Sequence, residues 1–190
     1  MEDFRISNYL GGVKTIGMAG HIRPDGDCVG SCIGLYTYLK HNFADIKVDL
    51  YLEPIPEKFA FLKYTEEIKH EFEGHKQYDL FISLDSSDVD RLGNFQEYFN
   101  TAKDTLCIDH HISNTEFAKN NIVFPKASSA SEVVYTLLDE EKVDYDVASA
   151  LYLGIIHDSG VFKYSNTSAN TMNIAGKLMG KGIPFTSIID

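Results

Sequence analysis

Aspartate and histidine residues gather at four places where apolar segments of the chain end. These places are HIRPDGD (21–27), DSSD (85–88), DHH (109–111) and HDSG (157–160). Clustered carboxylates repel one another and raise one another's pKa values, so such clusters indicate bound cations. Carboxylates combined with imidazoles favour Mn²⁺, Mg²⁺ or Fe²⁺ over a thiolate-rich zinc site.

Two cations sharing these residues would support phosphoryl chemistry. One carboxylate can bridge two ions about 3.5–4 Å apart, which is the spacing of two-metal hydrolases. A hydroxide held between the ions is a nucleophile at neutral pH, and the ions neutralise phosphoryl oxygens in the transition state. The pattern therefore predicts two divalent metal ions, with Mn²⁺ preferred and Mg²⁺ or Fe²⁺ as alternatives.

The overall charge limits the substrate class. The chain has 17 basic and 28 acidic residues, a net charge of −11. Such a surface repels long nucleic acids, because their non-specific binding depends on basic residues that neutralise phosphates. A small anionic substrate remains compatible with this charge if bound cations supply local positive charge.

Length and composition predict one ordinary globular domain. The chain has 190 residues, of which 44% are hydrophobic and 24% charged, and this excludes a disordered tail, a collagen-like chain and a coiled coil. Its three cysteines form no CxxC pair, which favours a reducing compartment. The start of the chain is not typical of a signal peptide, and no apolar run is long enough to span a membrane. We therefore predict a cytoplasmic protein without a membrane partner. The oligomeric state, including a homodimer, is left open.

Apolar strand patterns alternate with helical ones. Strands are predicted at 15–19, 46–52, 80–84, 105–108 and 122–124. Helices are predicted at 29–40, 147–156 and 169–179, and a further helix begins where Ser129 and Glu132 have capping-box spacing. This alternation predicts an α/β fold with a parallel central sheet and helices on both faces. Ligand sites in such folds lie beyond the C-terminal ends of the strands, where the Asp and His clusters occur.

The other acidic and histidine residues receive no catalytic role. Asp88 and Asp90 are interpreted as turn or helix-cap residues, because a single Asp after a strand usually has that role. His41, His70 and His75 lie among polar neighbours in the sequence and are assigned no function.

Four stretches together resemble the catalytic domain of the DHH phosphoesterase superfamily. They are GHIRPDGDCVGS (20–31), LDSSD (84–88), IDHH (108–111) and GIIHDSGVFKYSNTS (154–168), and they come in family order. The resemblance implies that His21 and Asp25 bind one metal ion. It implies that Asp27, His110 and Asp158 bind the other ion, and that Asp85 bridges the two. His111 would face the substrate phosphate, and Asp109 would orient the histidines.

Three further residues are candidate substrate contacts. Arg23 lies between two expected metal ligands and is within reach of a phosphate. Ser129 opens a helix whose N-terminal amides are able to bind an anion. Ser159 follows a metal ligand and is a candidate donor to the substrate.

Within the superfamily, the stretches at 21–31 and 157–168 are most similar to oligoribonucleases and phosphatases of 3′-phosphoadenosine-5′-phosphate (pAp). This implies hydrolysis of short RNAs, dinucleotides or pAp. Two alternatives stay open, namely an inorganic pyrophosphatase and a metal- or nucleotide-binding domain without turnover. The resemblance also implies that residues 1–180 are the catalytic domain. Residues 181–190 would begin a linker to a C-terminal substrate-binding domain that this chain lacks.

Overall fold

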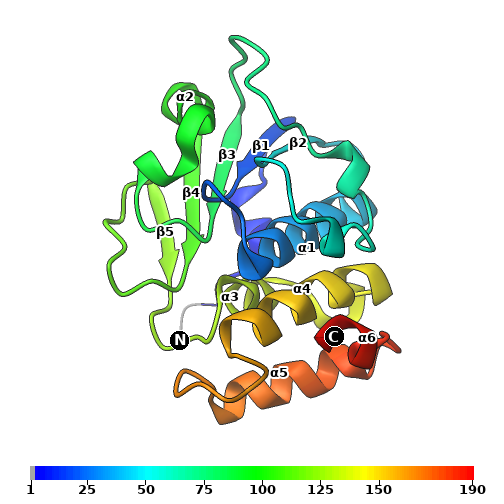
Figure 1. Cartoon of the computed structure of the whole chain (residues 1–190). Helices are drawn as coiled ribbons and strands as arrows, with labels where there is room; N and C mark the ends of the chain where they lie inside the picture. Colours follow the sequence, from blue (N-terminus) through cyan, green and yellow to red (C-terminus); the bar gives the residue numbers. More distant parts are fainter. Residues whose placement is uncertain (1–2) are drawn as a thin grey trace.

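A parallel sheet forms the centre of the protein (Figure 1). The computed structural model describes residues 3–190. In this range the sheet has five strands in the order β2-β1-β3-β4-β5, and every neighbouring pair is parallel. The strands are β1 (Thr15–Ala19), β2 (Lys47–Tyr51), β3 (Leu80–Leu84), β4 (Asp104–Asp109) and β5 (Asn120–Val123). The strand order reverses between β1 and β3, which is where open α/β sheets bind ligands.

Helices cover both faces of the sheet, so the predicted fold class is confirmed. On one face lie α1 (Gly26–Asn42) and α3 (Ala130–Leu137), with α4 (Tyr145–Asp158) packed on both. The helices α5 (Ala169–Met179) and α6 (Phe185–Ile189) pack against α4. The other face carries α2 (Gln96–Thr101) and the 3₁₀ segment Val89–Phe95. Short 3₁₀ turns occupy Ile6–Tyr9, Glu57–Phe59, Thr65–Glu67 and Glu140–Lys142.

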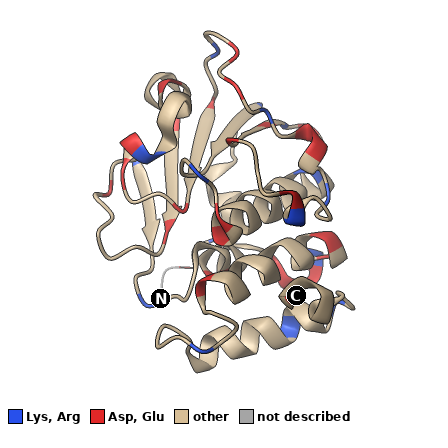
Figure 2. Ribbon diagram, viewed as in Figure 1, with Lys and Arg blue, Asp and Glu red and all other residues tan. Residues whose placement is uncertain are grey.

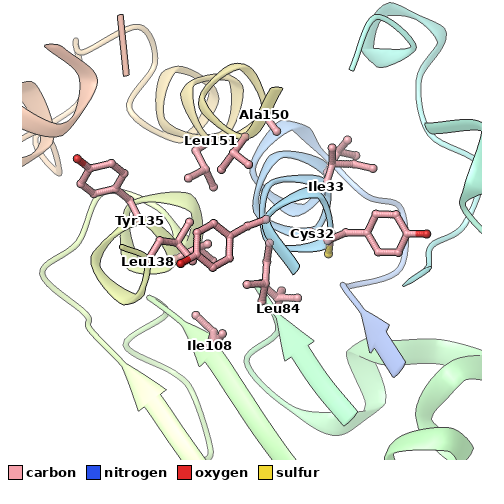
Figure 3. Packing of buried hydrophobic residues seen from close by; sticks show 14 of the residues in the cluster. Cys32, Ile33, Leu84, Ile108, Tyr135, Leu138, Ala150 and Leu151 are labelled. Carbon is pink, nitrogen blue, oxygen red and sulfur yellow. The ribbon is translucent and has the colours of Figure 1, made fainter. Parts of the chain in front are cut away.

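The main core lies between the sheet and the helices α1, α3 and α4. Figure 3 shows Leu84 of β3 and Ile108 of β4 facing helix residues such as Cys32, and all three side chains are fully buried. Helix α1 and helix α4 approach closely through glycines. A Cβ atom on Gly30 would lie 2.5 Å from the Ala150 carbonyl oxygen, so only glycine allows this contact.

The opposite face of the sheet is covered by an aromatic cluster. Its buried ring residues are Tyr51, Tyr78, Phe81, Phe95, Tyr98 and Phe99. The rings of Tyr51 and Tyr98 stack with centroids 4.6 Å apart. Because aromatic side chains bury 150–250 Å² each, this cluster lets two short helical segments cover a whole sheet face.

Helix capping explains where the helices begin. Helix α1 starts at Gly26, three residues before the predicted start, because the Asp25 carboxylate accepts hydrogen bonds from the amides of Asp27 and Cys28. Ser129 caps α3 as predicted, but Glu132 does not complete the reciprocal box. Its carboxylate instead accepts from the Ser128 amide at 2.9 Å.

The last ten residues belong to the packed domain. Ile183 and Ile188 are buried in the main core, and α6 contacts α4. The packed domain therefore continues beyond residue 180, the predicted boundary. Among the described residues, no helix has the length and apolar character needed to span a bilayer.

Candidate metal centre

The six predicted metal ligands come together at the C-terminal edge of the sheet. His21 follows β1, Asp85 follows β3 and His110 follows β4. Asp25 and Asp27 lie at the start of α1, where Figure 2 shows acidic segments in red beside the strand ends. The sixth residue, Asp158, does not follow a strand or helix; it is itself the last residue of helix α4.

One group of ligand atoms surrounds the His21 ring. Its Nε2 atom lies 3.6 Å from Asp25 Oδ1 and 3.4 Å from Asp85 Oδ2. The Nδ1 atom lies 2.7 Å from the Ile22 carbonyl oxygen, which can only accept a hydrogen bond. This contact places the proton on Nδ1 and directs the Nε2 lone pair at the carboxylates.

A second group surrounds the His110 ring. Its Nε2 atom lies 3.7 Å from Asp27 Oδ2, 3.2 Å from Asp158 Oδ2 and 3.5 Å from Asp85 Oδ1. Asp85 thus turns one oxygen to each histidine. Its backbone has a left-handed φ of 53°, which costs about 1–3 kcal/mol for a residue other than glycine.

The donor atoms fit divalent cations. Asp85 Oδ1 and His110 Nε2 are buried and have no hydrogen-bond partner among the described residues. Buried polar atoms are nearly always hydrogen-bonded in proteins, so each such atom needs an explanation. Carboxylate and imidazole donors are the ligands that Mn²⁺ and Fe²⁺ accept, so a cation bound here would satisfy both atoms.

The pKa values of the site report its excess negative charge. Burial lowers the pKa of His21, but the neighbouring carboxylates of Asp25 and Asp85 outweigh burial and raise it to about 11. Burial also lowers the pKa of His110, and Asp158 and Asp85 raise it to about 11. For Asp27, burial and then the charges of Asp85 and Asp158 raise the pKa well above its usual range. The cluster therefore attracts positive charge strongly.

Helix α3 holds Asp27 in place. The amides of Ala130 and Ser131 donate to Asp27 Oδ2 and Oδ1 at 2.6 and 2.9 Å. The N-terminus of α3 thus binds an anion, as the Ser129 cap suggested, but the anion is this protein's own carboxylate. A Cβ atom on Gly154 would lie 1.9 Å from Ser131 Oγ and 2.7 Å from Asp27 Oδ1, so the glycine keeps space for this contact.

The third histidine, His111, lies at the outer edge of the cluster, and a hydrogen bond holds its ring in place. Its Nδ1 lies 2.7 Å from Asp109 Oδ1, and this bond raises the pKa of His111. The side chain of His111 is 42% exposed, whereas Asp109 is fully buried. Asn114 donates to Asp109 Oδ2 at 2.8 Å and to the Ser86 carbonyl at 3.2 Å. Sequence reasoning did not identify Asn114, although its position three residues after His111 was the available signal.

The three predicted substrate contacts differ in their exposure to solvent. Ser129 and Ser159 are fully buried, and their hydroxyl oxygens accept from the amides of Glu132 and Phe162. Both hydroxyls therefore have partners in local turns inside the protein, and the prediction that these residues contact substrate stays a prediction. Arg23 is exposed and lies beside His21 at the mouth of a cavity.

Sequence comparison now identifies the family. Residues 15–155 match the DHH family, N-terminal domain. The chain belongs to the DHH family. The DHH triplet is Asp109-His110-His111, which supplies one ring to the ligand cluster and one to its outer edge.

Several curated relatives of this DHH chain share the name "Bifunctional oligoribonuclease and PAP phosphatase NrnA". The protein of that name from Thermus thermophilus is 30% identical over 176 residues, which are 91% of this chain and 52% of that one. The one from Bacillus subtilis is 32% identical over 179 residues, 91% of this chain and 54% of that one. A "Probable manganese-dependent inorganic pyrophosphatase" from Streptococcus thermophilus is 29% identical over 171 residues, 84% of this chain and 53% of that one. The DHH chain thus spans about half the length of these relatives.

Solved structures have the same fold as this DHH chain. An exopolyphosphatase-related protein from Bacteroides fragilis superposes with a TM-score of 0.85 at 23% identity, covering 96% of this chain and 57% of that one. The exonuclease RecJ bound to manganese superposes with a TM-score of 0.53 at 13% identity, covering 92% and 45%. At these identities the comparison shows the fold alone.

Proposed function

We propose that this protein is a metal-dependent phosphoesterase that hydrolyses short oligoribonucleotides, dinucleotides or pAp. The observation that carries the proposal is Asp85, which turns one carboxylate oxygen to each of two histidine-carboxylate groups. The substrate class is supported by the names of the relatives from Thermus thermophilus and Bacillus subtilis. A preference for Mn²⁺ is supported by the donor set and by the manganese named for one relative.

In this proposal the six ligands form two sites that share Asp85. His21 and Asp25 hold one cation, and Asp27, His110 and Asp158 hold the other. When bound, such cations supply positive charge to the phosphoryl oxygens and activate a water for attack at phosphorus. Since the protein has a net charge of −11, the cations would be the main source of that positive charge.

His111 completes the proposed chemistry from outside the ligand cluster. Asp109 accepts from His111 Nδ1–H, which fixes the ring plane and directs Nε2 away from the core. A proton on Nε2 is then available to the oxygen that leaves phosphorus. Asp109 itself stays ionised: burial raises its pKa, but the hydrogen bonds from His111 and Asn114 outweigh burial and lower it. Its part is to position His111.

The metal sites are tested by titrating Mn²⁺ into the 190-residue protein by calorimetry. We expect two ions per chain for the wild type and at most one for Asp85→Asn, a substitution of equal size that removes the shared charge. Asp90→Asn is the matched control, because Asp90 is exposed and outside the cluster. Two ions bound by Asp85→Asn with wild-type affinity would reject the bridging role.

The reaction is tested by comparing substrates with Mn²⁺ present. Release of mononucleotide from the dinucleotide pApA, without phosphate release from pyrophosphate, is the expected result. The opposite preference would identify a pyrophosphatase, which the relative from Streptococcus thermophilus makes the next candidate. Mn²⁺ binding without turnover of either substrate would identify a binding domain and reject the proposed activity.

A further inference from the structure

A cavity of about 360 Å³ opens beside His21, outside the ligand cluster. Four parts of the chain line it, namely the loop after β1, the chain just after β2, His70 and the 3₁₀ segment Val89–Phe95. The lining is mixed: polar side chains lie beside the apolar Phe95, which is largely buried. Ligand pockets of about 300–1,000 Å³ are typical of small molecules, and this volume lies near the lower limit. The cavity is therefore sized for one small group next to the metal centre.

The mouth of the cavity carries polar groups that have no protein partner. The Arg23 guanidinium and the Asn94 side-chain amide make no hydrogen bond or ion pair with any residue in the described range 3–190. His70, to which the sequence assigned no role, also lines the cavity. Its Nδ1 lies 2.9 Å from the Leu52 carbonyl, so its Nε2 remains available to a ligand. Ligand pockets place a few polar groups that are free to bind beside apolar side chains, as this lining does.

The walls of the cavity are held in place. The Arg23 amide donates to Glu53 Oε2 at 2.6 Å, and the Ile22 amide donates to the Arg91 carbonyl at 2.8 Å. Arg23 has a left-handed φ of 53°, a conformation that persists only when surrounding contacts enforce it. The position of Gly93 is equally tight, because a Cβ there would lie 2.5 Å from Ile22 Cγ2. The pocket is thus formed by the fold before any ligand arrives.

The chemistry of the lining selects the ligand. Arg23 is the one lysine or arginine in the lining, and Glu53 places a carboxylate beside it. That carboxylate disfavours a second phosphate group and favours hydroxyl or amino donors. The Phe95 ring suits a flat ring, and Asn94 and His70 suit its polar edge. A ribonucleoside has all of these parts.

We infer that this cavity binds the ribonucleoside attached to the scissile phosphate. The inference rests on the proposed function, since His21 places a phosphate bound at the metal centre next to the cavity. The base lies against Phe95, its edge bonds to Asn94 and His70, and the ribose hydroxyls face Glu53. Arg23 contacts the phosphodiester at the mouth. The cavity makes the enzyme select a phosphoester that carries a base, and Asn94 is a specificity-determining residue.

The experiment places a larger side chain at the rim of the cavity and measures nucleotide binding. Asn94 is exposed, so Asn94→Trp adds bulk at the mouth without disturbing the core, and circular dichroism checks the fold. Asn173→Trp is the matched control, because Asn173 is exposed on α5. Isothermal titration in Mn²⁺ compares two probes, adenosine 5′-monophosphate and inorganic phosphate. We expect Asn94→Trp to weaken the nucleotide about tenfold relative to phosphate, in line with the loss of base stacking, and Asn173→Trp to change neither.

Three results would overturn the inference. They are equal affinity of the wild type for nucleotide and phosphate, unchanged nucleotide affinity in Asn94→Trp, or equal weakening of both probes. The same variants are assayed on a dinucleotide and on its analogue lacking the scissile nucleotide's base. The ratio of kcat/KM between these substrates is expected to fall about tenfold in Asn94→Trp alone. If the wild type hydrolyses neither substrate, the proposed function fails, whereas nucleotide binding still decides the role of the cavity.

Discussion

Replacing Gly154 by alanine tests whether the contact between α1, α3 and α4 holds the site together. The new Cβ atom would lie 1.9 Å from Ser131 Oγ and 2.7 Å from Asp27 Oδ1, distances at which the neighbours must move. Asp27 has little freedom to move, because two α3 amides bind its carboxylate. Overpacking a buried contact costs about 1–3 kcal/mol, and we expect the upper end here. Alanine's better helix propensity returns about 1 kcal/mol.

The net expected loss is about 2 kcal/mol of unfolding free energy, or about 4–8 °C in Tm for a chain of this size. Urea unfolding followed by circular dichroism measures it. Gly176→Ala in α5 is the control, because no atom lies within 4 Å of its Cβ position. The same substitution should there stabilise the protein by about 0.5–1 kcal/mol. A Gly154→Ala protein as stable as the wild type, alongside the expected gain in the control, would refute the close-contact argument.

Three further substitutions test other contacts. Hydrogen bonds from a lysine ammonium group and two backbone amides lower the pKa of Asp79 to about 2. The ionised Asp79 carboxylate therefore stabilises the folded protein fully above the unfolded pKa of 3.8, and this stabilisation is lost as the pH falls toward 2. The stability gap between wild type and Asp79→Asn, measured by urea unfolding, should shrink between about pH 5 and pH 3; a constant gap would contradict this. Glu132 is 2% exposed and accepts from a backbone amide, two hydroxyls and a side-chain amide. Glu132→Gln should lose about 2 kcal/mol in the same assay, while the exposed control Glu141→Gln should stay within about 0.5 kcal/mol. Asp109→Asn should lower kcat on a dinucleotide about 10–100-fold with two Mn²⁺ ions still bound; wild-type kcat would show that His111 needs no partner.

Elements formed by short apolar runs were predictable from sequence. The strands at Thr15–Ala19 and Leu80–Leu84 and the helix at Ala169–Met179 have the predicted bounds. In the two strands, fully buried apolar residues end at a glycine or an aspartate, so the composition changes where the strand ends. The start of α1 was missed because the Asp25 side chain, rather than the apolar pattern, sets it.

The meeting of the Asp and His clusters followed from parallel strands, whose C-terminal ends share an edge. Contacts between residues that are distant in the sequence could be identified only from the structure. The α3 amides that bind Asp27 lie more than 100 residues away from it. The burial of Ser159 depends on how the loop after α4 folds back, and no local pattern in the sequence reports it.

The glycine contact between α1 and α4 has a consequence for ions of different size. Because backbone touches backbone at Gly30 and Gly154, no side-chain rotamer lies between the helices to adjust their separation. The span between Asp27 and Asp158 is therefore nearly constant. A change of ionic radius must be accommodated by the strand-end loops, such as the one where Ile112 is 89% exposed. Exchange of one divalent ion for a larger or smaller one should shift the histidine side of the site and leave its helical side in place.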